Sequence, residues 1–382
     1  MLKNILWYDR DGSGDIMIIK GDYSEAKVFV DTLEPKAHAQ IKKMCDAIIS
    51  EGVKIRIMPD VHVGKGSVIG TTMEIKDKVV PNLVGVDIGC GLIVSELKDR
   101  IIDFKKLDKI IKEHIPSGFE VRTRAHPNAL HVEIENLRCK DHVDIERAYQ
   151  SIGTLGGGNH FIEINEDEHY QKYLVIHSGS RHLGLQVAEY YQDLAQKHAK
   201  RQGYDISDDL AYLEGQDMDD YLHDMKIIQA FAYMNRKTMS DIVIDKMNFE
   251  VIDTFQTIHN YIDTDTMILR KGAVSSQKGE RFILPLNMAD GSIILTGKGN
   301  PDWNYSAPHG AGRIMSRSRA KRHLKLKSYQ DRMVGVYSSS ISFHTLDEAP
   351  QVYKEPEDIL KYIEETAKVE KHLKSIYNFK AK

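Results

Sequence analysis

Residues 156–181 read GGGNHFIEINEDEHYQKYLVIHSGSR, and this stretch predicts a β-hairpin with a histidine at each open end. Two short apolar runs, 161–164 and 173–176, flank a polar turn. If these strands pair antiparallel, the start of one lies beside the end of the other. That pairing sets His160 and His177 side by side, about 5 Å apart at the backbone. Two separate core histidines are the alternative, but matched positions at the strand ends favour a pair of metal ligands.

Two other segments supply further potential ligands. Asp87 and Cys90 stand three residues apart in the motif GVDIGCG, and His259 precedes an asparagine. Alone, the first segment could be a plain turn with a buried cysteine, and the second a packed histidine. With His160 and His177 they form a set of one carboxylate, one thiolate and three imidazoles, which suits Mn, Fe or Zn. The set could hold one structural metal or two metals of a phosphoryl-transfer site, and intrinsic affinity alone favours zinc.

A different glycine-rich segment surrounds His309, in the motif HGAGR. Two glycines let backbone amides approach a ligand, and Arg313, four residues after the histidine, can bind phosphate through two hydrogen bonds. The motif predicts a histidine nucleophile or a phosphate contact, with a plain glycine-rich turn as the alternative. The motif MPDVHVGKG adds Asp60, His62 and Lys65, but it lacks the spacing of a P-loop.

Strands and helices are segregated along the chain, which favours an α+β fold over a doubly wound sheet. The expected strands are residues 55–58, 67–69 and 92–97, and the expected helices are 36–49, 101–115, most of 185–248, and a closing helix over 356–376. The closing helix is inferred from four apolar residues whose spacing places them on one face: Ile359, Leu360, Ile363 and Ala367.

Composition limits the class of protein. The chain has 382 residues, 41% apolar and 28% charged, and 52 basic residues face 56 acidic ones, so it is neither disordered nor a general polycation. Three cysteines make no disulfide framework, so a reducing compartment is expected. The first twenty residues have no signal-peptide core, and no apolar run of about 18 residues is present. These features lead us to expect a cytoplasmic protein without a membrane segment.

Charge is unevenly distributed along the chain. Residues 205–224 contain eight acidic side chains and no lysine or arginine, most simply a solvated helix face. Residues 313–327 contain seven basic side chains and no acid. Because this basic run directly follows HGAGR, it is interpreted either as an ordinary exposed helix or as a phosphate-binding surface.

Taken in order, these motifs resemble the RtcB family of RNA-splicing ligases, which join RNA ends with GTP and Mn²⁺. The resemblance rests on MPDVHVGKG, GVDIGCG, GGGNHFIE, HSGSR, DLAYLEG, HNY, GKGNP and HGAGR, and it extends to DEAP with Tyr353 and Lys354. It implies a single α+β domain over residues 1–382, with mixed sheets around a central metal and nucleotide site and flanking helices.

The resemblance also implies roles for individual residues. His309 matches the residue that forms a covalent bond to GMP, and Asp60 matches a carboxylate that orients it. The positions that match ligands of two Mn²⁺ ions, with Cys90 bridging them, are Asp87, Cys90, His160, His177 and His259. The positions that match the nucleotide site are Asn159, Phe161, Glu163, Asn260, Ser292, Ala311, Gly312, Arg313 and Lys380. The candidate contacts to RNA phosphates are Arg181 and, in the basic run, Arg317, Arg319 and Lys321.

The implied substrate is RNA with a 3′-phosphate or 2′,3′-cyclic phosphate on one end and a 5′-hydroxyl on the other, in tRNA splicing or RNA repair. An archease-like activator is a candidate partner. Departures at Leu286-Asn287-Met288, Pro308 and His182 mark a divergent branch. The rival functions are a metal-dependent cyclic phosphodiesterase or phosphatase and a non-catalytic RNA-end binder. A hydrolase needs no nucleotidylated histidine, and a binder needs neither five ligands nor a nucleophile.

Overall fold

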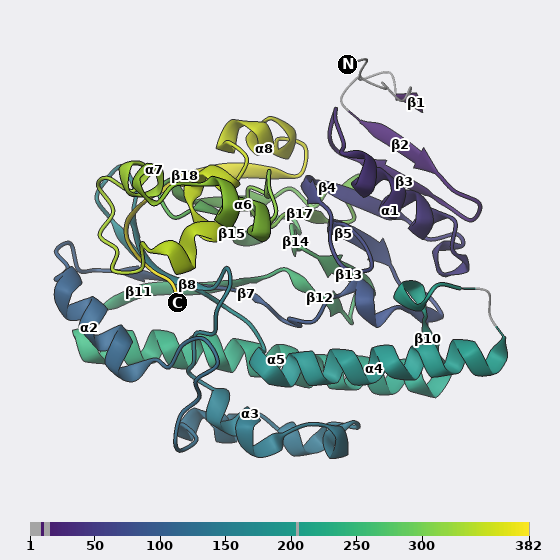
Figure 1. The fold of residues 1–382 in the computed structure, drawn as a ribbon, viewed down its shortest axis with the longest axis horizontal. Helices are drawn as coiled ribbons and strands as arrows, with labels where there is room; N and C mark the ends of the chain where they lie inside the picture. Colours follow the sequence, from purple (N-terminus) through teal and green to yellow (C-terminus); the bar gives the residue numbers. More distant parts are fainter. Residues whose placement is uncertain (1–8, 11–15, 204–205, 382) are drawn as a thin grey trace.

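The computed structural model describes residues 9–10, 16–203 and 206–381 (Figure 1). Asp205 of the acidic run, and most of the first fifteen residues on which the signal-peptide expectation depends, lie outside them. Two seven-stranded sheets dominate the fold. The first sheet runs, in spatial order, β1 (Asp9–Arg10), β2 (Met17–Lys20), β3 (Glu25–Val28), β4 (Ile55–His62), β5 (Ile69–Glu74), β13 (Ile268–Lys271) and β12 (Asn260–Asp263).

The second sheet holds the predicted hairpin at its centre. Its order is β11 (Val251–Ile258), β7 (Gly91–Leu97), β9 (Lys172–Ser178), β8 (Phe161–Glu166), β18 (Ala367–Phe379), β16 (Gly291–Gly297) and β15 (Arg281–Asn287). Two small pairs complete the strands, β6 (Lys78–Val79) with β10 (Leu213–Glu214), and β14 (Ala273–Ser275) with β17 (Ser306–Pro308). Mixed sheets with separate helices confirm the predicted α+β class.

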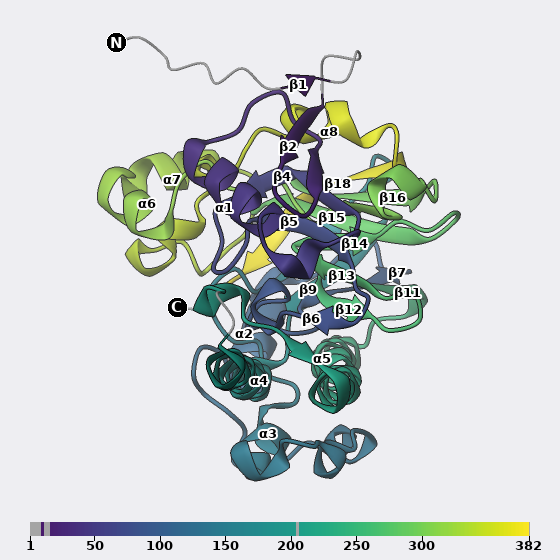
Figure 2. The same ribbon diagram turned by 90° about the vertical axis from the view of Figure 1, so that its right-hand side faces the viewer.

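Helices cover the sheets. The α-helices are α1 (Pro35–Cys45), α2 (Phe104–His114), α3 (Ile145–Ser151), α4 (Arg181–Gln202), α5 (Gly215–Met247), α6 (Arg317–His323), α7 (Leu326–Arg332) and α8 (Pro356–Ile363). Figures 1 and 2 show α4 and α5 side by side beneath the sheets, with α3 on their far side. Both long helices end in a residue with left-handed backbone, Gly203 and Asn248, as helix C-termini commonly do. In the described residues no helix is long and apolar enough to cross a membrane.

Packing against α5 fixes the second sheet. Ile93, Ile162 and Ile176, from three neighbouring strands, belong to one buried cluster with Met239 and Val243 of the helix. Burying each such side chain contributes roughly 1.5–3 kcal/mol relative to leaving it exposed. The helix therefore supports the sheet directly beneath the ends of its central strands.

The register of the second sheet aligns four strand ends. The predicted hairpin is confirmed, with Phe161 opposite His177, although both strands extend beyond the apolar runs. On the other side of β9, Ser178 pairs with Gly91, and Gly91 in turn pairs with Ile258 of β11. The residues just beyond these pairs therefore meet at one edge of the sheet.

The closing helix over 356–376 is a wrong prediction. Helix α8 ends at Ile363, and Ala367 begins the thirteen-residue strand β18. Leu373 and Tyr377 are four residues apart, so they fit a helical period, but every second residue from Leu373 to Phe379 is buried, as in a strand. Pairing with β8 on one side and β16 on the other overrides the local pattern.

The other helix predictions differ mainly at their ends. The helix expected over 36–49 stops at Cys45 and gives way to a short 3₁₀ turn, Ile48–Ser50. The helix expected over 101–115 begins later, because the Asp103 side chain caps its first turn by accepting from two backbone amides. The helical region 185–248 is two helices separated by the short strand β10.

Candidate active site

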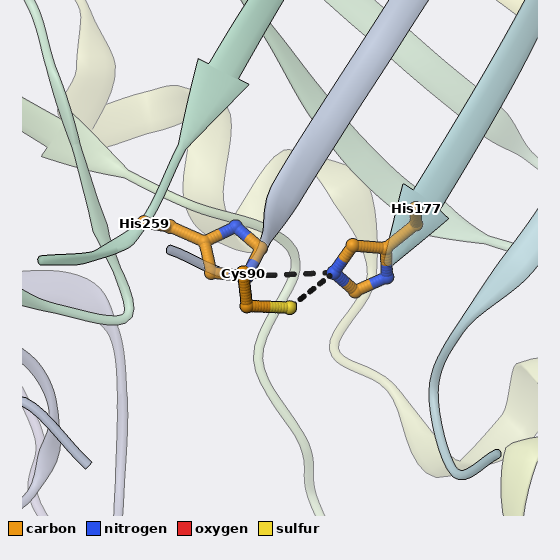
Figure 3. A group of neighbouring side chains, drawn as sticks. All are labelled: Cys90, His177 and His259. Atoms are coloured by element: carbon orange, nitrogen blue, oxygen red, sulfur yellow. Dashed lines mark hydrogen bonds between the residues drawn. The ribbon is translucent and has the colours of Figure 1, made fainter. Parts of the chain in front are cut away.

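The aligned strand ends bring the predicted ligands together. Cys90 precedes β7, His177 lies in β9, and His259 follows β11, and Figure 3 shows the three side chains pointing toward one another. The Cys90 Sγ lies 3.3 Å from His177 Nε2, which lies 3.4 Å from His259 Nε2. On the other side of the sulfur, His160 Nε2 lies 3.5 Å from Sγ and 3.0 Å from Asp87 Oδ2. All five predicted ligands thus form one cluster.

A close approach of the backbone lets Asp87 enter this cluster. A Cβ atom at Gly179 would lie 2.1 Å from an Asp87 carboxylate oxygen, so only glycine fits at that position. The same oxygen accepts a hydrogen bond from the Ser180 amide at 3.0 Å. The glycine of the HSGSR motif is therefore required by the carboxylate.

Hydrogen bonds to backbone carbonyls fix the tautomers of two histidines. Nδ1 of His160 donates to the Leu155 carbonyl at 2.9 Å, and Nδ1 of His177 donates to the Asn159 carbonyl at 3.2 Å. A carbonyl oxygen can only accept, so each Nδ1 carries a proton, and in the neutral imidazole Nε2 then carries a lone pair. Both Nε2 atoms face the Cys90 sulfur, and His160 Nε2 also faces the Asp87 carboxylate, so these atoms can act as donors to a shared cation. The donor set therefore fits a divalent metal ion.

The pKa shifts of the histidines and the cysteine in the cluster also favour a bound cation. Burial lowers the pKa of His177 and His259 well below the ordinary value, and neighbouring histidines lower it further, so both imidazoles are neutral donors. Burial also raises the pKa of the Cys90 thiol well above its usual range. A thiolate at this position therefore needs a cation beside it.

Two groups of donors share one atom. Cys90, His177 and His259 lie close enough to hold one ion, and so do Asp87, Cys90 and His160. The family and this buried cluster together suggest metal binding.

Helix α5 braces the backbone that carries the ligands. Arg236 is fully buried, and its Nη1 donates to the Gly89 carbonyl at 2.7 Å and to the Ser178 carbonyl at 2.9 Å. Its neighbour Asn235 accepts from the Gly153 amide and donates to the Ser178 hydroxyl. Arg236 has no carboxylate partner among the described residues, so its charge faces the anionic donors of the cluster. Asn235 and Arg236 lie between His177 and His259 in sequence, in a helix that belongs to none of the quoted motifs, so no local motif identifies them.

His309 lies beside the cluster and is held by Asp60. The ring centroids of His309 and His259 are 4.9 Å apart. Asp60, which is fully buried in β4, accepts from His309 Nδ1 at 2.5 Å and from its backbone amide at 3.2 Å. A Cβ atom at Gly312 would lie 2.6 Å from the Asp60 carbonyl, so this glycine permits the approach. With Nδ1 engaged, Nε2 is the ring nitrogen of His309 left for chemistry.

A cavity opens in front of His309. The predicted nucleotide residues that line it are Asn159, Phe161, Glu163, Ala311, Gly312, Arg313 and Lys380. The wall also contains Leu286, Asn287 and Met288, the turn that departs from the family pattern. Asn260 and Ser292 do not line the cavity: the Asn260 side chain accepts from the Gly272 amide, and Ser292 is buried in β16. His62 and Tyr353 line the cavity too, and although both lie in quoted motifs, neither was assigned a role from the sequence.

Three buried ionisable side chains lie at or next to the cavity: Glu163 and Lys380 line it, and Glu348 pairs with Lys380. Lys380 Nζ pairs with Glu348 Oε2 at 2.9 Å and donates to the Asn159 carbonyl at 3.2 Å. Although burial opposes ionisation, Lys380 and Arg317 lower the pKa of Glu348 to about 2. Glu163 differs: burial raises its pKa to about 7, even though Asn378 donates to it at 2.6 Å. Glu163 is thus a carboxyl group that changes charge near neutral pH.

The basic residues separate into paired and unpaired side chains. Arg317 pairs with Asp347 at 3.0 Å and also with Glu348, and Lys321 pairs with Asp347 at 3.3 Å. Arg319 is exposed, and its guanidinium has no ion-pair partner among the described residues. Arg181 is largely buried, donating from Nε to the Thr154 hydroxyl at 3.0 Å and from Nη2 to the Gly118 carbonyl at 2.8 Å.

A histidine oriented by a carboxylate, a cluster of metal-type donors and a cavity with cationic walls define an enzyme site of the phosphoryl-transfer class. The family model described as "tRNA-splicing ligase RtcB" matches residues 44–139 and 128–381. The chain belongs to the RtcB family, and the resemblance drawn from the motifs is confirmed.

Similar proteins agree with this placement. The RNA-splicing ligase RtcB of Escherichia coli K12 is 34% identical over 347 residues, spanning 80% of this chain and 85% of the relative. The RNA-splicing ligase RtcB1 of E. coli ATCC 25922 is 33% identical over 350 residues, with the same coverage. The tRNA-splicing ligase RtcB of Nanoarchaeum equitans is 26% identical over 408 residues, spanning 81% of this chain and 84% of the relative.

Proposed function

We propose that this chain is an RNA ligase that joins a 3′-phosphate or 2′,3′-cyclic phosphate end to a 5′-hydroxyl end through GMP bound to His309. The observation that carries the proposal is the hydrogen bond from His309 Nδ1 to the buried Asp60, beside the donor cluster and at the cavity wall. A histidine whose Nδ1 is held by a carboxylate directs its Nε2 toward an incoming phosphate as the nucleophile.

The proposed reaction proceeds by three transfers after any cyclic phosphate has been hydrolysed to a 3′-phosphate. His309 Nε2 attacks the α-phosphorus of GTP, the bond to the β-phosphate oxygen breaks, and pyrophosphate leaves. Asp60 keeps the Nδ1 proton in place and stabilises the positive ring. An oxygen of the RNA 3′-phosphate then attacks the same phosphorus, and the electron pair of the N–P bond returns to His309. Finally the 5′-hydroxyl attacks the activated 3′-phosphate, loses its proton to solvent, and GMP leaves.

The ligand proposal is two Mn²⁺ ions sharing the Cys90 sulfur. It is supported by the two donor groups that overlap at Cys90, one with His177 and His259 and the other with Asp87 and His160. Bound ions would polarise phosphoryl oxygens and draw off the negative charge that builds up during each transfer. Donor softness alone favours Zn²⁺ at such a site, so the choice of manganese rests on the family.

The guanine base is assigned to the cavity floor. Glu163 and Lys380 offer an acceptor and a donor there, and Arg313 projects from the turn that follows His309. Asn159, Phe161, Ala311 and Gly312 complete the proposed nucleotide site. Asn260 and Ser292 are assigned to it from the family resemblance alone. Guanine presents two N–H donors on one edge, which a carboxylate matches.

The titration of Glu163 predicts a pH dependence for guanine binding. Because burial raises its pKa to about 7, the empty protein favours the neutral acid, and the contribution of this group to the unfolding free energy falls as pH rises through about 7. Binding of guanine needs the carboxylate, so guanosine affinity should rise over the same range, by up to about tenfold per pH unit below the pKa.

Guanosine is the probe because it has no phosphate that titrates in this range. Calorimetry at several pH values should find the rise with the unmutated protein and a flat, weaker profile with Glu163→Gln. Adenosine, which lacks the paired donors, is the ligand control. A Glu163→Gln profile that rises as steeply as that of the unmutated protein would remove Glu163 from the guanine contact.

The proposed RNA path runs over α6. Arg319 has no ion-pair partner there among the described residues, whereas Arg317 and Lys321 would have to exchange Asp347 or Glu348 for phosphate. Arg181 would contact phosphate from within the site.

The substrate is proposed to be RNA from tRNA splicing or RNA repair, with an archease-like protein as activator and the cytoplasm as location. Residues from Asp60 to Lys380 contribute to one site, which supports a single domain over residues 1–382.

The direct test is ligation of two short RNAs, one with a 3′-phosphate and the other with a 5′-hydroxyl, in the presence of GTP and Mn²⁺. The expected product is the joined RNA, formed with GTP and not with the metal alone. Opening of a cyclic phosphate without joining, and without any dependence on GTP, would favour the hydrolase alternative instead.

A further inference from the structure

Phe119 is an exposed aromatic side chain with an unusually well-held backbone. It lies between α2 and α3, and 96% of its surface is exposed. Its carbonyl accepts from Arg147 Nη2 at 2.9 Å, and the preceding Gly118 is bonded on both sides. A single exposed apolar residue is ordinary in a soluble protein. A phenyl ring held out by a fixed backbone, making no contribution to the core, is a feature that packing does not explain.

The position of this backbone relates Phe119 to the candidate active site. The Gly118 amide donates to the Gly156 carbonyl at 2.9 Å, at the start of the loop that carries Asn159 and His160. A Cβ atom at Gly157 would lie 3.9 Å from the Gly118 Cα, so the two loops are in contact. Gly118, the residue before Phe119, therefore contacts the loop that carries Asn159 and His160.

Two arginines accompany the ring. Arg181 Nη2 donates to the Gly118 carbonyl at 2.8 Å, and Arg147 donates to the next carbonyl along. Burial lowers the pKa of Arg181, the Asp87 carboxylate opposes this, and the charge of Arg147 lowers the pKa further, so the two guanidinium groups are near each other. Neither forms an ion pair with a carboxylate in the part of the chain that the structure describes. The loop thus combines an exposed ring with two guanidinium groups, and the Arg181 group also lies close enough to the Asp87 carboxylate to be stabilised by it.

We infer that Phe119 is a stacking platform for an unpaired base at the end of the RNA substrate, next to the phosphate that Arg181 and Arg147 attract. Single-stranded nucleic acid is bound by this pairing of aromatic faces with cationic groups that follow the backbone. Phe119 directly follows Gly118, whose carbonyl Arg181 contacts, so the ring and the guanidinium group belong to one short segment that could bind a base and its phosphate. This inference rests on the proposed function. It adds a contact that binds the terminal base of the RNA by stacking, without discriminating between bases.

The experiment measures stacking directly, in the absence of GTP. A short RNA with a 3′-phosphate and 2-aminopurine as its last base is titrated with the protein, because stacking on an aromatic ring quenches that fluorophore. The expected result is quenching on binding to the unmutated protein. Phe119→Ala should lose the quenching and bind about tenfold more weakly. Phe119→Trp should restore both, because a larger aromatic face can replace the ring.

Leu130→Ala is the matched control, since Leu130 is 84% exposed in the same connecting segment and is not in the proposed surface. Its affinity and quenching should equal those of the unmutated protein. Thermal unfolding of each variant shows that the fold is kept. Equal quenching and affinity in Phe119→Ala, or an equal loss in Leu130→Ala, would overturn the stacking assignment. A protein that is not labelled by GTP would instead overturn the proposed function, so the two failures are distinct.

Discussion

Replacing His309 with alanine should abolish covalent attachment of GMP to the protein. The unmutated protein, incubated with Mn²⁺ and α-labelled GTP, should acquire a label that acid removes, as phosphoramidates are acid-labile. Asp60 holds Nδ1 of His309 at 2.5 Å and directs the other ring nitrogen to the transfer. The other histidines that line the cavity, His62, His177 and His259, have no hydrogen bond to a carboxylate among the described residues, so the loss should be complete rather than partial. Ligation, which depends on the same intermediate, should fall with it.

The control is His323→Ala, which removes an exposed histidine of α6 that bonds only to a backbone carbonyl of its own helix. This variant should be labelled as well as the unmutated protein. A label that persists in His309→Ala would place the nucleophile elsewhere. If the unmutated protein takes no label from GTP or from ATP, the hydrolase alternative becomes the working hypothesis, and opening of cyclic phosphate is the next assay.

The part of the site that sequence reasoning could find is the part built by local pairing. A hairpin joins residues close in sequence, so two apolar runs and a polar turn are enough to place His160 beside His177. Cys90 and His259 join them only because β7 and β11 add to the outer side of β9. That strand order depends on long-range packing against α5, which has no signature in the spacing of the residues.

The C-terminal segment illustrates the same limit. Lys380 enters the cavity because β18 runs between β8 and β16 and ends beside Asn159. The helix predicted for this segment gave no local reason to place Lys380 in the cavity. Only the family resemblance assigned Lys380 to the site. The pattern from Leu373 to Phe379 fits both periods, and partners from two other parts of the chain decide between them.

Charge is a third case. The run from 313 to 327 contains no acid, so its side chains looked uncompensated in sequence. The structure supplies Asp347 and Glu348 from a later turn, and they pair with Arg317 and Lys321. Such neutralisation across some thirty residues is invisible to composition. Of the three RNA candidates in this run, Arg319 is the one whose guanidinium has no ion-pair partner among the described residues.

Replacing Cys90 with alanine should remove metal binding and, with it, both guanylylation and ligation. Cys90 is the one donor common to the two groups, so its loss weakens both at once, whereas loss of His259 or Asp87 affects one group. Manganese bound per chain, measured after gel filtration, should fall from about two to less than one. The fold should remain, because hydrogen bonds to backbone carbonyls hold His160 and His177 without the sulfur.

Thermal unfolding separates a lost ligand from a lost fold. In the unmutated protein, chelation should lower the unfolding temperature by a few degrees, because a metal at a hundredfold excess over its Kd stabilises the native state by about 2.7 kcal/mol. Cys90→Ala should unfold at the temperature of the chelated protein and should not respond to chelator. Cys139→Ala is the matched control: Cys139 is equally buried but lies outside the cluster, so it should keep the metal and the response. Full metal content in Cys90→Ala would exclude the shared sulfur and leave the histidines and Asp87 as the ligands.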